Sequence, residues 1–166
     1  MANYGTANNK GRSSGKSNGR EGKIRGAPEG SSWVWLTFEL LSSDAWRSRS
    51  RNCIRLIDRL ILEHMAHAGR ENGSLIVTYN QFKEFGVRRN DIKRSVDEAV
   101  AYGLLRVTEQ GGFKGASKLP NRYRLTFLPS DEKGYVRLAS NEWKSITDDH
   151  IKKWEQKTHI KKQNYG

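Results

Sequence analysis

The course of this chain is indicated most clearly by residues 78–96, which read TYNQFKEFGVRRNDIKRSV. Thr78 and Gln81 have the spacing of a capping box, in which the threonine hydroxyl accepts a hydrogen bond from the amide three residues on and the glutamine reaches back. A helix is therefore expected to begin at Tyr79. It should end just before Gly86, because glycine commonly terminates a helix. The stretch predicts a short helix, a glycine turn and a second helix.

The second helix has an apolar face formed by Ile92, Val96 and Ala99, which recur at helical spacing. Gly103 follows Tyr102 at the position where helices often end in a left-handed residue. The opposite side is expected to be exposed and mostly polar. It comprises Asn90, Arg94 and Ala101, flanked by Lys93 and Asp97 on one edge and by Asp91 and Glu98 on the other.

A longer amphipathic helix is expected upstream, ended by Gly69 and the pair Asn72-Gly73. Its predicted apolar face consists of Cys53, Ile54, Ile57, Leu60, Ile61, His64 and Met65. Before it, the aromatic and β-branched run 33–38 predicts a strand. Ser42, Ser43 and Asp44 offer capping side chains for a short helix at Ala45 and Trp46.

Two β runs, residues 104–109 and 121–127, enclose the Gly-rich segment 111–118 downstream of the helices. The second run alternates, with Tyr123, Leu125 and Phe127 on one side and Arg122, Arg124 and Thr126 on the other. Two strands around a Gly-rich loop predict a β-hairpin. A further short strand is expected at residues 75–77.

Composition limits the classes of function that fit this chain. Of 166 residues, 30 are Lys or Arg and 18 are Asp or Glu, which gives a net charge of +12, and only 35% are apolar. The size predicts one domain with tails. Strong positive charge favours a polyanionic partner, most often nucleic acid. The single cysteine, Cys53, supports neither an internal disulfide nor a multi-cysteine zinc site.

The chain is expected to divide into three parts. Residues 1–31 are rich in Gly, Ser and Asn and predict a disordered basic tail, either a solubilising leader or an arm that touches DNA. Residues 32–129 form the predicted domain. Residues 130–166 form an extension with a helix near 148–161, in which Trp143 is expected to pack back on the domain and Trp154 is left open. No apolar run is long enough to span a membrane or to act as a secretory signal, so a cytoplasmic location is expected.

The predicted order of elements over about residues 49–128 resembles the winged helix-turn-helix family. Gly86 and Val87 stand where that family has its turn, and Gly103-Leu104 where its recognition helix ends. The resemblance implies an α+β fold with a three-helix core and a β-hairpin wing. To these the sequence adds an N-terminal strand and short helix and a C-terminal helix. The chain also resembles small helix-turn-helix proteins of bacterial plasmids, phages and integrative elements.

The family places its second helix in the major groove of DNA, and recognition helices contact bases mainly through N-terminal residues. Base contacts are therefore predicted for Arg88, Arg89, Asn90, Lys93 and Arg94. Contacts to the DNA backbone are predicted for Lys114, Lys118 and Arg122 of the hairpin, Arg49 and Arg51 near the long helix, and Thr78 and Tyr79. A solvated polar face is the competing interpretation, because Asp97 and Glu98 would repel phosphate.

The predicted function is non-catalytic binding of double-stranded DNA by a transcription regulator, or by a replication or maintenance accessory protein of a bacterial mobile element, associated with the nucleoid. No constellation for catalysis, metal or cofactor is found, and His64 and His67 lack further ligands at suitable spacing. Alternatives are a winged-helix protein–protein interaction module and RNA binding. Homodimerisation, the DNA target, the direction of regulation and any effector ligand are left open.

Overall fold

The computed structural model describes residues 32–114, 117–132 and 135–163. Side chains are described within these ranges except at 113, 114, 117, 118, 131, 132 and 159–163. The chain divides into two compact units, Met1–Trp33 and Val34–Gly166, and the elements below belong to the second. The expected basic tail at 1–31 lies outside the described residues, and the boundaries expected at 31 and 129 stay predictions.

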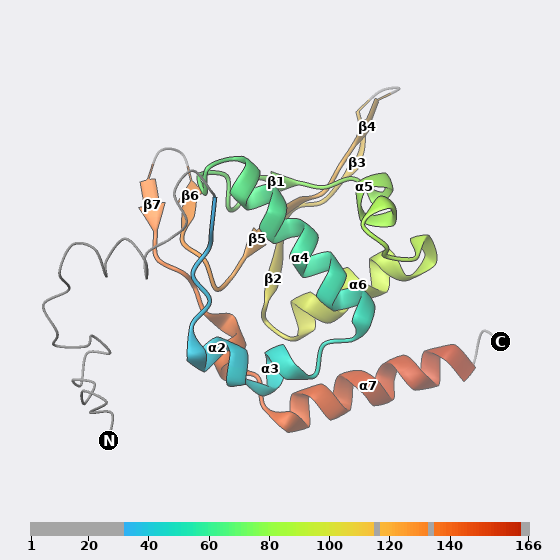
Figure 1. Ribbon diagram of the computed structural model, residues 1–166. Helices are drawn as coiled ribbons and strands as arrows, with labels where there is room; N and C mark the ends of the chain where they lie inside the picture. Colours follow the sequence, from blue (N-terminus) through green and yellow to red (C-terminus); the bar gives the residue numbers. More distant parts are fainter. Residues whose placement is uncertain (1–31, 115–116, 133–134, 164–166) are drawn as a thin grey trace, which may run out of the picture. The chain divides into compact units, whose positions relative to one another are not determined.

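The described part of the second unit combines helices with a small antiparallel sheet, as an α+β protein does (Figure 1). Its helices are α2 (Phe38–Ser42), α3 (Asp44–Arg47), α4 (Arg51–Ala66), α5 (Tyr79–Glu84), α6 (Ile92–Ala101) and α7 (Asp148–Gln163), with 3-10 turns η1 (Arg89–Asp91) and η2 (Glu142–Ser145). Its strands are β1 (Leu75–Ile76), β2 (Leu105–Glu109), β3 (Gly112–Lys114), β4 (Ser117–Leu119), β5 (Arg122–Leu125), β6 (Ser130–Glu132) and β7 (Tyr135–Arg137).

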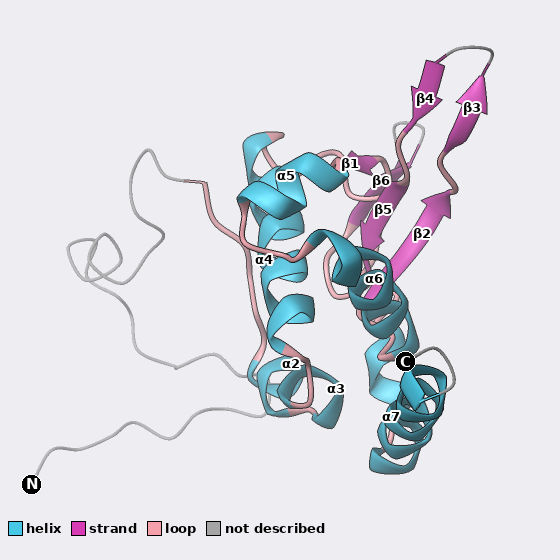
Figure 2. Cartoon of the chain, turned by 90° about the vertical axis from the view of Figure 1, so that its right-hand side faces the viewer, coloured by secondary structure: helices cyan, strands magenta, loops and turns pink. Residues whose placement is uncertain are grey.

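The central sheet has the strand order β1-β5-β2, and all its pairings are antiparallel. The Gly-rich segment expected to be a loop instead continues the hairpin as the separate pair β3–β4, which projects beyond the sheet (Figure 2). Gly111 makes this junction possible, because a Cβ there would lie 2.5 Å from the Leu119 carbonyl oxygen. Its amide donates to Oδ1 of Asn121 at 2.6 Å. The hairpin is therefore confirmed, and it is longer than expected.

The core lies between α4, α6 and the inner face of the sheet. Ile92, Val96 and Ala99 of α6 are buried, as the spacing predicted. On α4 the predicted face is wrong in one respect: Ile54 is 38% exposed and Leu56 is buried instead. The predicted outward positions Arg124 and Thr126 are also buried; the Thr126 hydroxyl donates to the Gly103 carbonyl at 2.6 Å, and the Thr126 carbonyl accepts from the Asn141 amide at 2.9 Å.

The strand expected at 33–38 is wrong. Residues 34–37 have no regular structure, and Phe38 begins α2. Thr37 caps that helix, because its hydroxyl accepts a hydrogen bond from the Leu40 amide at 3.2 Å. Of the run itself only Val34 is partly buried against the core, whereas Phe38 is exposed; the first buried residue is Leu40, which follows the run in α2. The short helix expected next is confirmed as α3, capped by Ser43.

The segment after the sheet packs on the same body as the helices. Trp143 is buried, which confirms the expectation that it packs back, and α7 confirms the helix predicted near 148–161. The β6–β7 pair and η2 were not predicted. They bring the chain back across the end of α6, where the Cα of Gly103 closely approaches the backbone at Trp143.

Gly103→Ala is expected to destabilise the protein by about 3 kcal/mol. Gly103 has a φ of +64°, and an added Cβ would lie 2.7 Å from the Trp143 amide nitrogen. The left-handed backbone costs an alanine ~1 to 2 kcal/mol, and overpacking costs ~1 to 3 kcal/mol. Denaturant unfolding measures the change. Gly112→Ala is the control, because nothing lies within 4 Å of its Cβ position, and equal effects in the two variants would contradict this account.

Candidate functional site

The α5–α6 pair has the local geometry that its sequence predicts. The Thr78 hydroxyl accepts from the Gln81 amide at 3.3 Å, and Oε1 of Gln81 accepts from the Thr78 amide at 2.8 Å, which confirms the capping box. Gly86 has a φ of +89° and ends the first helix. The amide of the buried Val87 then donates to the Phe82 carbonyl at 2.9 Å. The turn leads through η1 into α6, whose inner face packs against α4.

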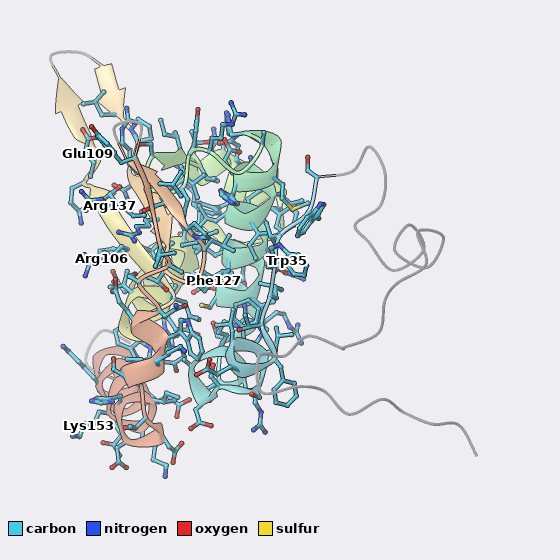
Figure 3. All side chains as sticks on the ribbon, turned by 90° about the vertical axis from the view of Figure 1, so that its left-hand side faces the viewer. Trp35, Arg106, Glu109, Phe127, Arg137 and Lys153 are labelled. Carbon is cyan, nitrogen blue, oxygen red and sulfur yellow. The ribbon has the colours of Figure 1, made fainter. Side chains whose placement is uncertain are left out.

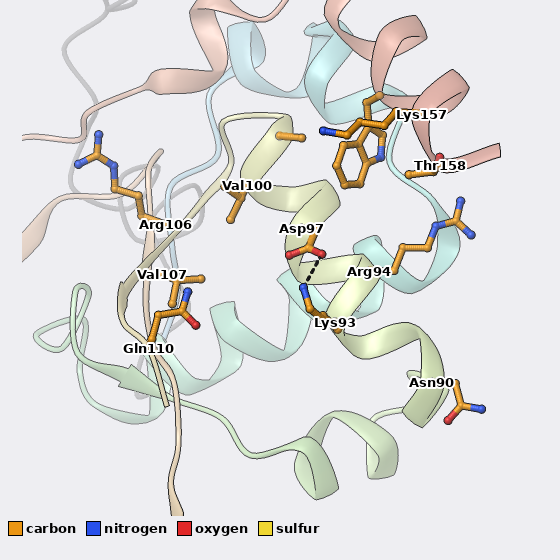
Figure 4. Close-up of a pocket in the computed structure, with 12 residues that line it drawn as sticks. Asn90, Lys93, Arg94, Asp97, Val100, Arg106, Val107, Gln110, Lys157 and Thr158 are labelled. Atoms are coloured by element: carbon orange, nitrogen blue, oxygen red, sulfur yellow. Dashed lines mark hydrogen bonds and ion pairs between the residues drawn. The ribbon is translucent and has the colours of Figure 1, made fainter. Parts of the chain in front are cut away.

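The outward face of α6 lies in a groove of about 1100 Å³ that is bordered by β2 and α7 (Figure 4). The lining residues from the first turns of α6 are polar or charged, and those from its last turn are apolar. The lining residues of α6 are Asn90 (in η1), Lys93, Arg94, Asp97, Val100 and Ala101; Arg106, Val107 and Gln110 come from β2 and its end, and Trp154, Lys157 and Thr158 from α7.

Positive charge predominates in this groove, since four of its lining side chains are cationic and only Asp97 is anionic. Lys93 donates to Asp97 at 2.9 Å, and this hydrogen bond and the charge of Asp97 raise the pKa of Lys93. Arg106 pairs with Glu142 at 2.9 Å. Within the described part of the chain, no salt bridge engages Arg94 or Lys157. These two cations are therefore available to an anionic ligand.

The five residues predicted to contact bases are divided among three hollows. Asn90, Lys93 and Arg94 line the large groove. Arg88 lines a pocket of about 360 Å³ beside the start of α4, and Arg94 also borders that pocket. Arg89 lines a pocket of about 520 Å³ between α5 and the base of the β3–β4 hairpin, where it donates to Oδ1 of Asn80 at 3.4 Å. The structure thus brings three of the five together and places the other two on either side.

The residues predicted to contact the DNA backbone also lie at different places on the structure. Arg51 lines the pocket shared by Arg88 and Arg94, whereas Thr78 and Tyr79 line the pocket that holds Arg89. Arg122 pairs with Glu109 at 2.8 Å. The side chains of Lys114 and Lys118 lie outside the described ones; in the backbone, 114 pairs with 117 and 118 with 113.

Arg49 has a structural position that differs from the exposed one expected. Its guanidinium carbon lies 3.4 Å from the centre of the Trp46 ring, and Nε donates to the Trp46 carbonyl at 2.7 Å. Burial lowers the pKa of Arg49, although nearby acidic groups oppose this effect. Its charge therefore stacks on Trp46 and is partly withdrawn from solvent, and a contact of Arg49 to DNA stays a prediction.

Glu98 does not lie on the exposed face, contrary to the expectation. It is 4% exposed, and its carboxylate accepts from the amide of Ser50 at 2.6 Å and from the Ser50 hydroxyl at 2.7 Å. A carboxylate at this position suits the positive end of α4. The objection that Asp97 and Glu98 would repel phosphate is therefore weakened, because Glu98 is internal and Asp97 is paired with Lys93.

Three groove residues, Arg106, Trp154 and Lys157, were not predicted to contribute to a site. The only signal in the sequence was Trp154, which lies three residues after Ile151 and so shares a face of α7 with it. Nothing local to residues 148–158 indicates which part of the molecule that face covers. The position of α7 depends on the return of the chain through β6, β7 and η2, which the sequence did not reveal.

The titratable groups of α4 have internal roles. His64 is buried, and burial lowers its pKa. His67 is exposed and lies 3.3 Å from Glu63 and 3.5 Å from Glu71. Cys53 is buried, as expected, and burial raises the pKa of its thiol. Among the described residues no group of three or more His, Cys, Asp or Glu side chains could hold a metal ion.

No family model, no curated protein and no solved structure matches the chain. A search of the described residues for a helix of the length and apolar character needed to cross a bilayer found none.

Glu98→Ala is expected to lower the free energy of unfolding by about 2 to 3 kcal/mol, because it removes the charged acceptor of the Ser50 amide and hydroxyl. Glu98→Gln keeps one acceptor and should cost less. Asp97→Ala, at the exposed neighbouring position, is expected to change stability by only ~0.5 kcal/mol. Chemical denaturation of the three variants gives the comparison, and a loss in Asp97→Ala as large as that in Glu98→Ala would contradict the assignment.

Stability is expected to fall as the pH is lowered through the range just below the ordinary histidine pKa of 6.5. His64 has a lowered pKa in the folded state, so below 6.5 the unfolded chain binds the proton more readily and is favoured. The contribution is complete above 6.5 and is lost as the pH falls toward the folded-state pKa. His64→Gln should reduce the fall in the free energy of unfolding between pH 7 and pH 5. His67→Gln, at an exposed position, should retain the fall that comes from the burial of His64.

Proposed function

We propose that this chain is a double-stranded DNA-binding protein of winged-helix architecture, in which α6 is the recognition helix and the β3–β4 hairpin extends the wing. The observation that carries the proposal is the groove along the outward face of α6, where Asn90, Lys93 and Arg94 are gathered between β2 and α7. The succession α4, β1, α5, α6, β2, β5 and the sheet order β1-β5-β2 support the architecture. The net charge of +12 supports a polyanionic partner.

Recognition would combine base contacts with phosphate contacts. Arg94 can donate a bidentate pair of hydrogen bonds to guanine and Asn90 can pair similarly with adenine, and each good pair contributes ~1 to 3 kcal/mol of discrimination. Arg88 and Arg89 extend this set on either side of α6. Phosphates would be bound by Arg51, Thr78 and Tyr79 and by the hairpin residues Lys114, Lys118 and Arg122, which hold the protein in register on the duplex.

A role in transcription regulation, or in the replication or maintenance of a bacterial mobile element, follows as the proposed biological context. It rests on the resemblance of the chain to small helix-turn-helix proteins of bacterial plasmids, phages and integrative elements. Activity in the cytoplasm, on nucleoid DNA, and as a homodimer is part of the same proposal. A dimer would place two α6 helices about one helical turn of DNA apart, ~34 to 36 Å.

A protein–protein interaction module is the second candidate, and one observation favours it. Val100 is 43% exposed and lines the groove together with Ala101, Val107 and Trp154. These apolar residues could hold an apolar side chain of a partner. Arg94 distinguishes the two candidates, because a protein interaction centred on Val100 does not require it.

Arg94→Ala is expected to weaken binding to a preferred duplex by about 10-fold or more, and to reduce the preference at particular base pairs. The measurement is selection of bound fragments from random duplex DNA by the full chain at two salt concentrations, followed by binding titrations. Arg70→Ala is the matched control: it removes one exposed arginine that lines none of the three hollows.

Equal effects of the two substitutions would show that only overall charge matters. Sequence-independent binding that disappears at the higher salt would have the same meaning. Either result would contradict sequence-specific DNA binding and favour the protein–protein interaction module. Preference for single-stranded RNA over the duplex would instead support RNA binding.

A further inference from the structure

α7 forms one wall of the groove, and its apolar residues fix it to the body of the molecule. Ile151 is buried in the core, and Trp154 is partly buried and packs against the core. Trp154 and Lys157 both line the groove and lie three residues apart on α7, so the anchoring residue and a cation without a salt bridge to any described residue share one side of the helix. This helix therefore belongs to the same surface as α6.

The lysines of α7 fall into two groups. Lys153 lies one turn before Lys157 on the same side of the helix, both are exposed, and neither forms a salt bridge with any described residue. Lys152 lies on a different side and pairs with Asp148 at 2.5 Å. Asp149 is the acid closest to the Lys153 side, one turn nearer the start of the helix. Figure 3 shows Lys153 of α7 and Arg106 of β2 along the same edge of the molecule.

The dimensions of DNA restrict what α7 can do if α6 is bound. The major groove is ~12 Å wide and a helix with its side chains is ~10 to 12 Å across, so one helix fills the groove. α7, packed beside α6, cannot enter with it. It must then lie against a phosphate strand, where exposed and unpaired lysines would be favourable and acidic residues would not.

We propose that α7 is a second phosphate-binding element, which contacts through Lys153 and Lys157 the DNA strand that borders the major groove opposite the wing. The inference rests on the proposed function, since it takes α6 as the recognition helix. The β3–β4 hairpin and α7 lie at opposite ends of the face that carries β2 and α6 (Figures 1 and 2). The duplex lies between them, and the hairpin and α7 each contact a different part of the DNA backbone.

The test is the salt dependence of duplex binding by the full chain, compared with that of the double variant Lys153→Gln/Lys157→Gln. Each phosphate contact contributes about 0.9 to the slope of log K against log salt, so the double variant should have a slope shallower by about 2. Lys152→Gln is the matched control, with the same charge change per residue on the same helix. Hydroxyl-radical footprinting should show that protection is lost on one flank of the site only.

Each outcome distinguishes the inference from the function on which it rests. A shallower slope in the double variant alone supports α7 as a phosphate-binding element. A slope equal to that of the wild-type chain, while Arg94→Ala still weakens binding, overturns the role of α7 and leaves the DNA-binding proposal standing. Absence of duplex binding by the wild-type chain overturns both. Loss of binding to single-stranded RNA or to an acidic protein, with duplex binding unchanged, assigns α7 to another partner and overturns the inference. All exposed lysine variants should retain the wild-type unfolding midpoint, which excludes misfolding.

Discussion

The packing of α6 on α4 is the constraint on which the site depends, and the Glu98 carboxylate defines its rotation. The Glu98 carboxylate accepts from Ser50 at the start of α4, and Asp91, seven residues earlier in the sequence, accepts from Nδ2 of Asn52 at 2.9 Å. These two hydrogen-bonded contacts with α4, about two turns apart along α6, leave few possible rotations of α6 about its axis. Buried apolar contacts alone are less specific, because they are non-directional. The orientation of Arg94 toward the groove follows from this pair of hydrogen-bonded contacts.

The inward orientation of Glu98 explains how α6 can contain this acidic residue without lowering the positive charge of its outward face. A carboxylate on the outward face of α6 would repel phosphate, but Glu98 is turned inward and offsets the positive end of the α4 dipole. Asp97 remains outward and holds Lys93 in place by an ion pair between exposed groups, an interaction of modest strength that a ligand can displace. The groove therefore keeps its positive potential although α6 contains two adjacent acids.

The local features of the sequence predicted much of this fold, and the non-local ones did not. The capping box at Thr78, the turn at Gly86 and the end of α6 at Gly103 depend on contacts within a few residues, and all three are confirmed. The run at 33–38 misled, because its β-branched and aromatic residues form no strand, and Trp35 and Phe38 are exposed rather than covered. Helical spacing also placed Asn90, Lys93 and Arg94 on the outward part of α6, where they line the groove, but it put Glu98 at an exposed edge, whereas Glu98 is buried against Ser50. The position of α7 beside α6 depends on contacts between residues far apart in the sequence, such as Gly103 and Trp143, which no periodicity encodes.

The return of the chain across α6 also limits how the groove can change. Gly103 allows the backbone at Trp143 to approach more closely than any side chain would permit, and Trp143 is buried there. The buried Trp143 is followed within a few residues by α7, so the wall formed by Trp154 and Lys157 is tied to the end of α6 by a short, tightly packed connection. A helix anchored in this way cannot swing far from α6 without unpacking Trp143, which would expose a large apolar surface at a cost of ~1.5 to 3 kcal/mol or more. Any molecule that occupies the groove along α6 therefore also meets α7, because residues of both helices line it.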